Sequence, residues 1–231
     1  MAARNSLLMR EPAHVLTANA VRSQILGGIL VPGAQLRQDA VGKMYGVSQA
    51  TVREAFRSLE AEGLLMSIPN RGMFVTQVSV AYVAEVYALR ENLETLALCK
   101  SFPHLGETEF LQAQKLLERS EKKEKFSLIG PSNRAFHAVF YSAGKLTLTI
   151  DLIERCFGGI TPSWMRFIRE QPDRAAQYGQ TASQQHWDLL RACQAGSLDD
   201  ARSALSIHLT DACSVLIEFM NETQNEKEPV R

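Results

Sequence analysis

Three histidines, His137, His186 and His208, lie inside segments with helical spacing in the second half of the chain. Asn133 precedes His137 by four residues, so both side chains project from one helix face. Neutral imidazoles bind divalent metals, and side chains on separate helices can converge in a bundle core. A metal site is one interpretation. Single helical histidines are also typical of surface or hydrogen-bonded core positions, and spacing alone leaves the alternatives open.

A second group of residues has the chemistry to read DNA. Gln49, Thr51 and Arg53 share the first turn of an expected helix and offer an amide, a hydroxyl and a guanidinium, which suit base edges in a groove. Ser48 before them is a good N-cap, because its hydroxyl can accept a backbone N–H. The apolar residues of this segment form one stripe that must face a core. The segment 46–60 therefore predicts the recognition helix of a helix-turn-helix.

The elements that would position this helix follow from apolar periodicity and turn residues. Gly46 is a natural stop for the preceding helix, because glycine adopts the left-handed conformation found there. Pro69-Asn70-Arg71-Gly72 is typical of a hairpin turn between two strands. The expected helices are 14–30, loosened or ended at its glycines, and 38–45, and the expected strands are 64–68 and 73–76. Together they predict a winged helix-turn-helix with a two-stranded wing.

Beyond the wing, the chain is expected to be almost wholly helical, with breaks at Pro and Gly, including Gly158-Gly159 and Pro162. The expected helices are 79–102, 105–123, 127–143, 146–157, 160–170, 174–195 and 198–223. The fold class is therefore mostly α, a winged helix-turn-helix followed by an all-α bundle. The expected domains are a flexible arm 1–13, a DNA-binding domain 14–77, a helical effector-binding and dimerisation domain 78–223, and a frayed tail 224–231.

Composition restricts the class of protein. The 231 residues have no net charge, but residues 1–77 hold eight Lys/Arg against five Asp/Glu, whereas the remainder holds 17 against 20. A basic first part suits a nucleic-acid partner. The four cysteines are far apart and form no C-x-x-C pair, which favours free thiols in a reducing compartment. No run reaches the ~18 apolar residues of a membrane span. We expect a soluble, cytoplasmic protein with no membrane partner.

The first part of the chain resembles the GntR family of bacterial transcription regulators over most of residues 15–76. The resemblance rests on three runs with specific joint spacing. Their residues are Ile25, Leu26, Gly28, Leu30, Pro32, Gly33 and Leu36; Gly46, Val47, Ser48, Val52, Arg53, Glu54, Ala55, Leu59, Glu62, Gly63 and Leu64; and Pro69, Arg71, Gly72 and Val75. The resemblance implies a DNA-binding regulator, and we expect a repressor.

The second part resembles the FCD domain of the FadR-like branch of that family. The matching residues are Asn133, Phe136 and His137; His186, Leu189, Ala192, Ala195 and Gly196; and Ala201, Leu205, His208 and Leu209. In that domain an acidic residue and three histidines hold a metal, often zinc or nickel. The resemblance places His137, His186 and His208 as ligands, with Asn133 at the acidic position. Because Asn is neutral, it removes one negative charge and should lower metal affinity.

The resemblance also implies an effector. Effectors in the family are mostly small organic acids, and a metal with three imidazole ligands keeps open positions for a carboxylate or hydroxyl. Arg90 matches an arginine common in the cavity of this domain and could bind a carboxylate bidentately. Alternatively, Arg90 pairs with Glu91 or Glu94 at the surface. Trp164, Arg166 and Arg169 are further candidates for the cavity wall, although Trp164 also fits a simple core position.

Carried over to this chain, the family's DNA contacts imply a role for seven residues in binding a double-stranded operator. They are Arg37, Ser48, Gln49, Thr51, Arg53, Arg71 and Gly72, the last two at the wing tip. Gln49 departs from the family pattern, which usually has Arg there. Because an amide can read adenine where a guanidinium reads guanine, we expect an altered base at that operator position. One winged helix contacts few base pairs, so we expect a homodimer formed by the helical domain.

Two alternatives to an effector-responsive regulator follow from the same residues. In a metal-responsive regulator the metal itself would be the signal, although Asn133 argues against the tight ligation that such a sensor needs. In a metal-dependent enzyme the three histidines would activate a water. No acid–base carboxylate accompanies the histidines in the sequence, so we expect no catalytic residues.

Overall fold

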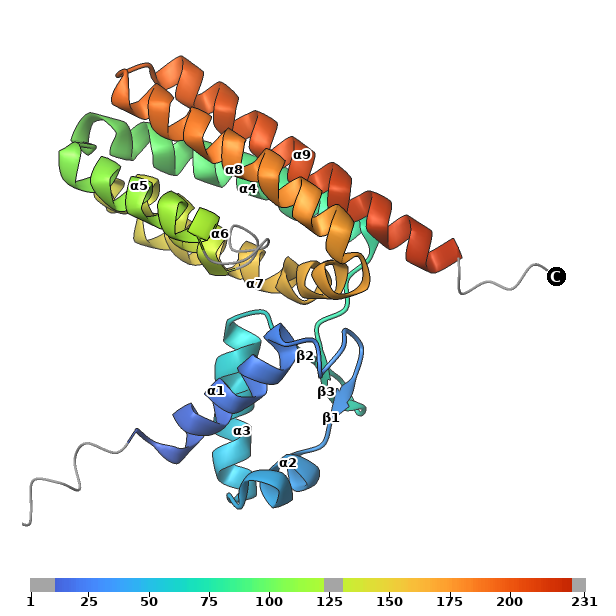
Figure 1. The fold of residues 1–231 in the computed structure, drawn as a ribbon. Coiled ribbons are helices and arrows are strands. Elements are labelled where there is room, and N and C mark those ends of the chain that lie inside the picture. Colours follow the sequence, from blue (N-terminus) through green and yellow to red (C-terminus); the bar gives the residue numbers. More distant parts are fainter. Residues whose placement is uncertain (1–10, 123–130, 226–231) are drawn as a thin grey trace, which may run out of the picture. The chain divides into compact units, whose positions relative to one another are not determined.

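The computed structural model describes residues 11–122 and 131–225. The chain divides into two compact units, Met1–Gln77 and Val78–Arg231 (Figure 1). Most of the expected arm 1–13 and tail 224–231 lies outside the described residues. Within them, the first helix already begins at Ala13, and the last continues to Asn225.

From residue 11 onward, the first unit contains three helices and a small sheet (Figure 1). The elements are α1 (Ala13–Leu26), β1 (Gln35–Leu36), α2 (Gln38–Tyr45), α3 (Gln49–Ala61), β2 (Leu65–Ile68) and β3 (Gly72–Val75). The expected second helix is confirmed in full, and the first ends at Leu26, earlier than Leu30, with Gly27 as its C-cap. This arrangement confirms a winged helix-turn-helix.

Local residue chemistry sets the turn between α2 and α3. Gly46 ends α2 in the left-handed conformation, at φ 65°, where a side chain would add strain. Ser48 then caps α3 by accepting a hydrogen bond from the Thr51 backbone N–H at 3.1 Å. The buried stripe of α3 packs against α1 and fixes the rotation of the helix about its axis. Its residues are Val52, Ala55, Phe56 and Leu59.

The wing has one strand more than the sequence indicates. β1 pairs with β3 antiparallel, and the strand order is β1-β3-β2. A two-residue strand is too short to give an alternating pattern, so the expectation of two strands was incomplete. Leu36 of β1 is buried opposite Met73 of β3. The extra strand therefore ties the segment before α2 to the base of the wing.

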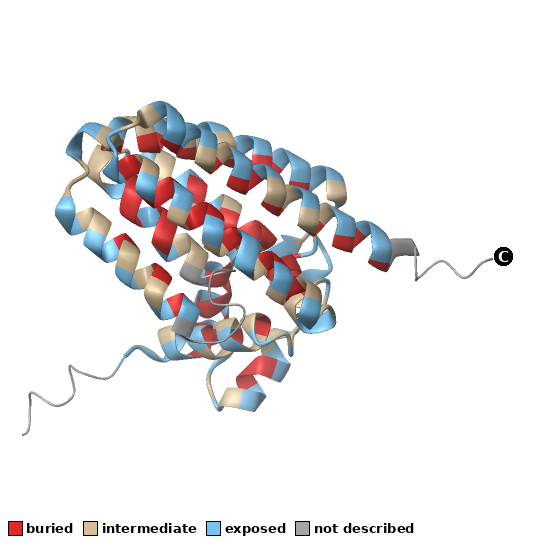
Figure 2. Ribbon diagram, turned by 45° about the horizontal axis from the view of Figure 1, so that its top comes forward, coloured by how far each residue is buried: buried red, intermediate tan, exposed pale blue. Residues whose placement is uncertain are grey.

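The second unit is helical throughout its described part (Figure 1). Its elements are α4 (Val80–Ser101), the short 3-10 helix η1 (Phe102–His104), α5 (Glu107–Lys122), α6 (Pro131–Tyr141), the short 3-10 helix η2 (Ser142–Gly144), α7 (Thr147–Glu170), α8 (Pro172–Gln194) and α9 (Leu198–Asn225). Buried positions lie on the inner faces of these helices and exposed positions on the outer faces (Figure 2). The expected all-α bundle is confirmed.

The predicted break inside 146–170 is wrong, because α7 runs unbroken from Thr147 to Glu170. Gly159 lies against α4: a Cβ there would be 3.0 Å from the Tyr82 hydroxyl. The glycine therefore permits a close helix approach instead of ending the helix. Pro162 cannot donate to the carbonyl four residues earlier. The preceding Thr161 donates its hydroxyl to the Phe157 carbonyl at 2.7 Å, which adds a bond in this turn.

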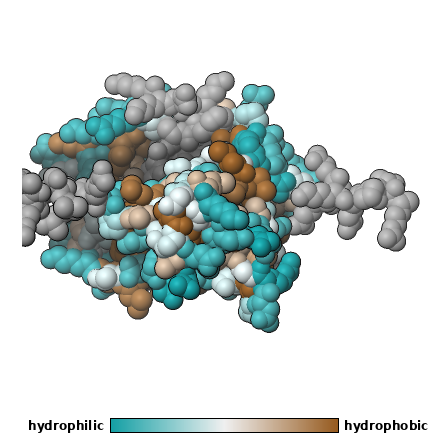
Figure 3. Space-filling model, turned by 90° about the horizontal axis from the view of Figure 1, so that it is seen from below, coloured by the Kyte–Doolittle hydropathy of each residue, from teal (hydrophilic) through white to brown (hydrophobic). Residues whose placement is uncertain are grey.

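Among the described residues, one helix has the length and composition of a membrane span, the stretch Leu198–Thr223 of α9. The sequence expectation was that no run of ~18 apolar residues occurs, and charged residues such as Asp200, Arg202 and Asp211 do interrupt this stretch. In the structure α9 packs against α4 and α8, and its apolar residues Leu205, Leu209 and Leu216 are buried in the core. The apolar character of α9 is therefore that of a core helix. The face of the molecule in Figure 3 is mostly hydrophilic, with smaller hydrophobic areas.

Candidate functional site

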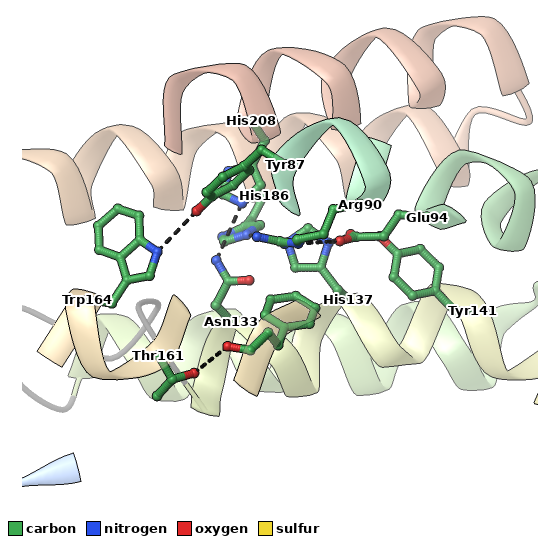
Figure 4. A network of polar contacts seen from close by, with 11 residues as sticks. Tyr87, Arg90, Glu94, Asn133, His137, Tyr141, Thr161, Trp164, His186 and His208 are labelled. Carbon is green, nitrogen blue, oxygen red and sulfur yellow. Dashed lines mark hydrogen bonds and ion pairs between the residues drawn. The ribbon is translucent and has the colours of Figure 1, made fainter. Parts of the chain in front are cut away.

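Three helices of the second unit bring the three histidines together. His137 comes from α6, His186 from α8 and His208 from α9, and one ring nitrogen of each lies within 4.8 Å of the others (Figure 4). The Nε2 atoms of His137 and His186 are 3.2 Å apart. Two nitrogens bound to one tetrahedral zinc at the usual bond lengths would be ~3.3 Å apart. The cluster therefore has the donor type and spacing of a metal site.

Hydrogen bonds behind His137 fix which of its nitrogens faces the cluster. The Tyr141 hydroxyl donates to Glu94 Oε2 at 2.5 Å and lies 3.0 Å from His137 Nδ1. Since the hydroxyl proton is used for Glu94, the oxygen must accept from Nδ1–H. The Nε2 atom is then unprotonated and faces the cluster as a ligand atom.

His208 has an equivalent support from α8 and α9. Its Nδ1 lies 3.0 Å from Gln185 Oε1, and the Gln185 amide nitrogen donates to Asp211. The bond to Asp211 orients the amide, so that its oxygen accepts Nδ1–H of His208. The Nε2 atom of this ring is also left free for a metal.

The buried setting keeps all three rings neutral. Burial lowers the pKa of His186 to about 3, with the Arg90 charge adding to the shift. Burial, followed by the neighbouring rings and Arg90, lowers the pKa of His137 and His208 well below their usual value. Neutral imidazoles are the form that binds metals, so these rings need not lose a proton at neutral pH.

Asn133 lies beside the cluster on α6, where the sequence places it. Its amide nitrogen is 3.4 Å from His208 Nε2, and its Oδ1 is buried without a hydrogen-bond partner. A half-turn of the amide would exchange the two atoms and direct the oxygen at the histidines. The structure therefore brings all four expected residues together, and Asn133 has a free oxygen to offer.

Arg90 pairs with Glu94, as the alternative expected, but the pair is buried and not at the surface. Its Nε donates to Glu94 Oε1 at 2.7 Å, and both side chains are at most 3% exposed. The guanidinium lies 3.9 Å from the centre of the Phe157 ring and 4.9 Å from that of Tyr87. Nη2 has no hydrogen-bond partner. The guanidinium is thus fixed through Nε by Glu94, and its Nη2 can still donate a hydrogen bond to a ligand.

A small cavity of ≈ 20 Å³, about the room for one water-sized group, lies between Arg90 and His208 of the histidine cluster. It is lined by Tyr87, Arg90, Asn133, Phe157, Ile160, Thr161, Trp164, Tyr178, His208 and Ala212. Trp164 is part of the wall and donates its indole N–H to the Tyr87 hydroxyl at 3.0 Å. Arg166 and Arg169 are not in this wall and pair with Glu170 instead. Four of the ten lining residues are Tyr, Phe or Trp, and Arg90 is the cation among the ten.

Sequence reasoning missed three polar residues of this site. Tyr141 and Glu94 support His137, and Gln185 supports His208. Tyr141 follows His137 by one helical turn, and Gln185 immediately precedes His186. The first spacing was a usable signal. The contact of Glu94 with α6 crosses 47 residues of sequence and has no local signature.

In the first unit, the start of α3 presents its polar residues outward. Gln49 and Arg53 are exposed, and Thr51 is half-buried. The Ser48 hydroxyl lies 2.9 Å from that of Thr51, so both are engaged in the helix cap. Among the residues that the structure describes, no ion pair involves Arg53, because Glu54 pairs with Arg57 and Asp39 with Arg37. The guanidinium of Arg53 is therefore available to a ligand.

The remaining expected DNA contacts lie at exposed positions. Arg37 precedes α2 and forms a 3.3 Å ion pair with Asp39. At the wing turn, Arg71 and Gly72 are exposed, and the Arg71 guanidinium lies 5.4 Å from the centre of the Phe74 ring. Gly72 has φ 96°, which other residues rarely adopt. The turn between β2 and β3 thus presents the exposed guanidinium of Arg71.

Comparison with known proteins assigns both units. Residues 17–75 match the family described as bacterial regulatory proteins, gntR family, and residues 85–211 match the FCD domain. The chain is 23% identical over 223 residues to the HTH-type transcriptional repressor RspR of Escherichia coli K12, covering 93% of each protein. It is 32% identical over 111 residues to the HTH-type regulator YdhC of Bacillus subtilis, covering 48% of this chain and 50% of that protein.

Solved structures share the fold. Escherichia coli McbR/YncC has a TM-score of 0.74 at 22% identity, covering 90% of this chain and 99% of that one. A GntR regulator from Rhodococcus sp. RHA1 has a TM-score of 0.73 at 23% identity, covering 89% and 97%. These relatives are transcription regulators and not enzymes. FCD domains bind metals, and this one has a three-histidine cluster able to hold one. The chain belongs to the GntR family of DNA-binding transcription regulators, in the FadR-like branch that carries a C-terminal FCD effector-binding domain.

Proposed function

We propose that this regulator is a cytoplasmic, homodimeric repressor whose operator affinity is set by a small carboxylate bound at a metal-containing cavity. The metal, zinc or nickel, is held by His137, His186 and His208 with Asn133 as a fourth, neutral ligand. Arg90 binds the effector carboxylate. The effector shifts the population of two arrangements of the paired DNA-binding units, one of which fits the operator.

The observation that carries this proposal is that the histidine cluster and the Arg90 guanidinium, each with unused binding positions, lie next to one cavity, which Arg90 and His208 line. The Nε2 atoms of His137 and His186 are 3.2 Å apart, and Arg90 nearby has a buried Nη2 without a partner. Buried donors and acceptors are nearly always paired, so an unpaired one indicates a position that binds a ligand or has another functional role. A carboxylate has two oxygens, which suits a guanidinium and a metal at the same time.

On the DNA side, we propose that α3 enters the major groove of a double-stranded operator. Gln49, Thr51 and Arg53 would face base edges, with Ser48 beside them at the start of the helix. Arg37 would bind phosphate, and Arg71 with Gly72 at the wing tip would contact the backbone or minor groove. The support is the exposure of Gln49 and Arg53, together with the absence of an ion pair at Arg53 within residues 11–122 and 131–225.

The test is an operator-binding titration with the full chain. The operator is obtained by selection from random duplexes, and its affinity is measured with and without 1,10-phenanthroline, a neutral chelator. A panel of small carboxylic acids is then added to the metal-loaded protein. We expect at least one acid to change operator affinity, and the chelator to abolish that response.

The other outcomes separate the alternatives. A response to metal alone, with no acid active, would identify a metal-responsive regulator. Operator binding that ignores chelator and every acid would contradict the proposal. Sedimentation of the same sample tests the homodimer, and a monomer at the concentrations that bind operator would contradict that part.

A further inference from the structure

The side chains that would hold the metal carry no negative charge. Their donor atoms are three neutral imidazoles and one amide oxygen. The carboxylate behind them, Glu94, is already paired with Arg90 at 2.7 Å. Binding of a divalent cation would therefore leave a net charge of about +2 among histidines that are at most 1% exposed. An uncompensated buried charge is costly.

No other carboxylate contacts these histidines in the described part of the chain. Asp211 acts only through Gln185, whose amide lies between it and His208. Asp211 is also half-exposed, so solvent screens its charge. It orients His208 but does not neutralise the site. The described residues therefore do not supply the negative charge that the donor set lacks.

The cavity shows where that charge would sit. Arg90 and Asn133 both line it, together with His208 (Figure 4). In the described chain, three buried side-chain nitrogen or oxygen atoms lack a hydrogen-bond partner, and they are Arg90 Nη2, Asn133 Oδ1 and His186 Nδ1. Two of the three thus border one cavity. An anionic oxygen there would meet an unused guanidinium donor and the open side of the histidine cluster.

We propose that the metal and the anionic effector bind interdependently in this protein, because Asn133 leaves the effector to supply the negative charge that the donor set lacks. This inference rests on the proposed function, since it needs both ligands at the same cavity. The effector is then a co-ligand of the metal, and the metal is loosely held without it. By thermodynamic reciprocity, each ligand tightens the other by the same factor.

The experiment measures Co²⁺ binding to the metal-free, full-length protein by visible absorption, which reports the ligands around the ion. Acetate, succinate and benzoate serve as carboxylate probes, and chloride at equal ionic strength is the control. We expect at least one probe to tighten Co²⁺ binding about fivefold or more, the lower end of typical coupling. The same probe should change the Co²⁺ spectrum.

Two variants make the test specific, with far-UV circular dichroism to verify that each is folded. Asn133→Asp supplies the missing charge, so Co²⁺ should bind more tightly without a probe and respond less to the probe. Arg90→Lys keeps the charge opposite Glu94 but loses the planar fork. Its response to the probe, taken as the ratio of its Co²⁺ affinities with and without the probe, should be weaker than that of the wild type.

Each contrary outcome has a distinct meaning. Equal Co²⁺ affinity with all three probes and with chloride would overturn the interdependence while leaving the metal site intact. An Asn133→Asp protein that binds Co²⁺ no more tightly than the wild type would also overturn it. If neither protein binds Co²⁺ under any of these conditions, the metal site of the proposed function fails, and the inference fails with it.

Discussion

The polar residues of the two units are held in opposite ways. Gln49 and Arg53 on α3 are exposed, and the apolar stripe on the opposite face of the helix determines where they point. His137 and His208 are at most 1% exposed, and a network of other polar side chains determines where they point. On α3, the orientation of each exposed side chain does not depend on its polar neighbours. In the histidine cluster, the orientation of each side chain depends on the hydrogen-bond partner beside it.

This difference has an energetic consequence. An exposed residue such as Arg53 can be replaced with little effect on stability, because water replaces its contacts. A buried network is affected as a whole when one member is lost, because each unsatisfied group costs free energy in the protein interior. The DNA-binding face should therefore respond to substitution residue by residue, and the cavity should respond as a unit.

The largest expected effect is the loss of metal binding when one imidazole is removed. In His137→Ala, Co²⁺ affinity should fall by more than the ~100-fold upper range that loss of a supporting residue causes. The reason is that three of the four proposed ligands cannot reproduce the site. Equilibrium dialysis measures the affinity, and His104→Ala, at an exposed histidine, is the control.

Operator binding of His137→Ala in the absence of metal and effector should match that of the metal-free wild type. A variant that keeps wild-type metal affinity would remove His137 from the ligand set. It would also contradict the view that the cavity residues depend on one another whereas the exposed residues of the DNA-binding face do not.

A smaller effect is expected from the residue behind His137. Tyr141→Phe removes the hydroxyl that accepts from His137 Nδ1 and donates to Glu94. Metal affinity should fall about 10- to 100-fold, as it does when an outer partner of a metal ligand is lost. The measurement is the same dialysis, with Tyr82→Phe on α4 as the control. Unchanged affinity would show that the network does not act as a unit.

The same contrast explains what the sequence reveals. Val52, Phe56 and Leu59 repeat with helical spacing, so the buried side of α3 and hence its exposed side follow from local periodicity. The histidines of the cavity could be placed on helices in the same way, and their selection as ligands came from the family resemblance. Their supports could not be placed. Glu94 and Tyr141 are 47 residues apart, and only packing of α4 against α6 brings them together.

Packing also overrode local signals in α7. Gly158-Gly159 and Pro162 are helix-ending residues by propensity, yet the helix continues through them. Tertiary contacts outweigh a cost of about 1 kcal/mol for a glycine and about 3 kcal/mol for a proline in a helix. Gly159 is used for close contact with Tyr82, which no local rule anticipates.

On the DNA face, Arg53→Ala tests the independence of exposed residues. The free energy of operator binding should become less favourable by about 1–3 kcal/mol, the range for loss of one base-reading arginine. Thermal stability should change little, because no ion pair of Arg53 is lost within the described residues. Arg57→Ala is the matched control, since Arg57 lies one turn further along α3 and is paired with Glu54. Equal losses from both substitutions would indicate general electrostatic attraction instead of base reading.

The smallest expected effect is a change of preference at one base pair. Because the Gln49 amide suits adenine and a guanidinium suits guanine, Gln49→Arg should move the preferred base from adenine to guanine at a single operator position. Binding-site selection with the two proteins measures this directly. Discrimination at that position should be about 1–3 kcal/mol, and preferences elsewhere should stay the same. If the wild type already selects guanine there and Gln49→Arg leaves the site unchanged, Gln49 does not read the operator. Changes at several positions together would instead mean that the DNA-binding residues are coupled, as those of the cavity are.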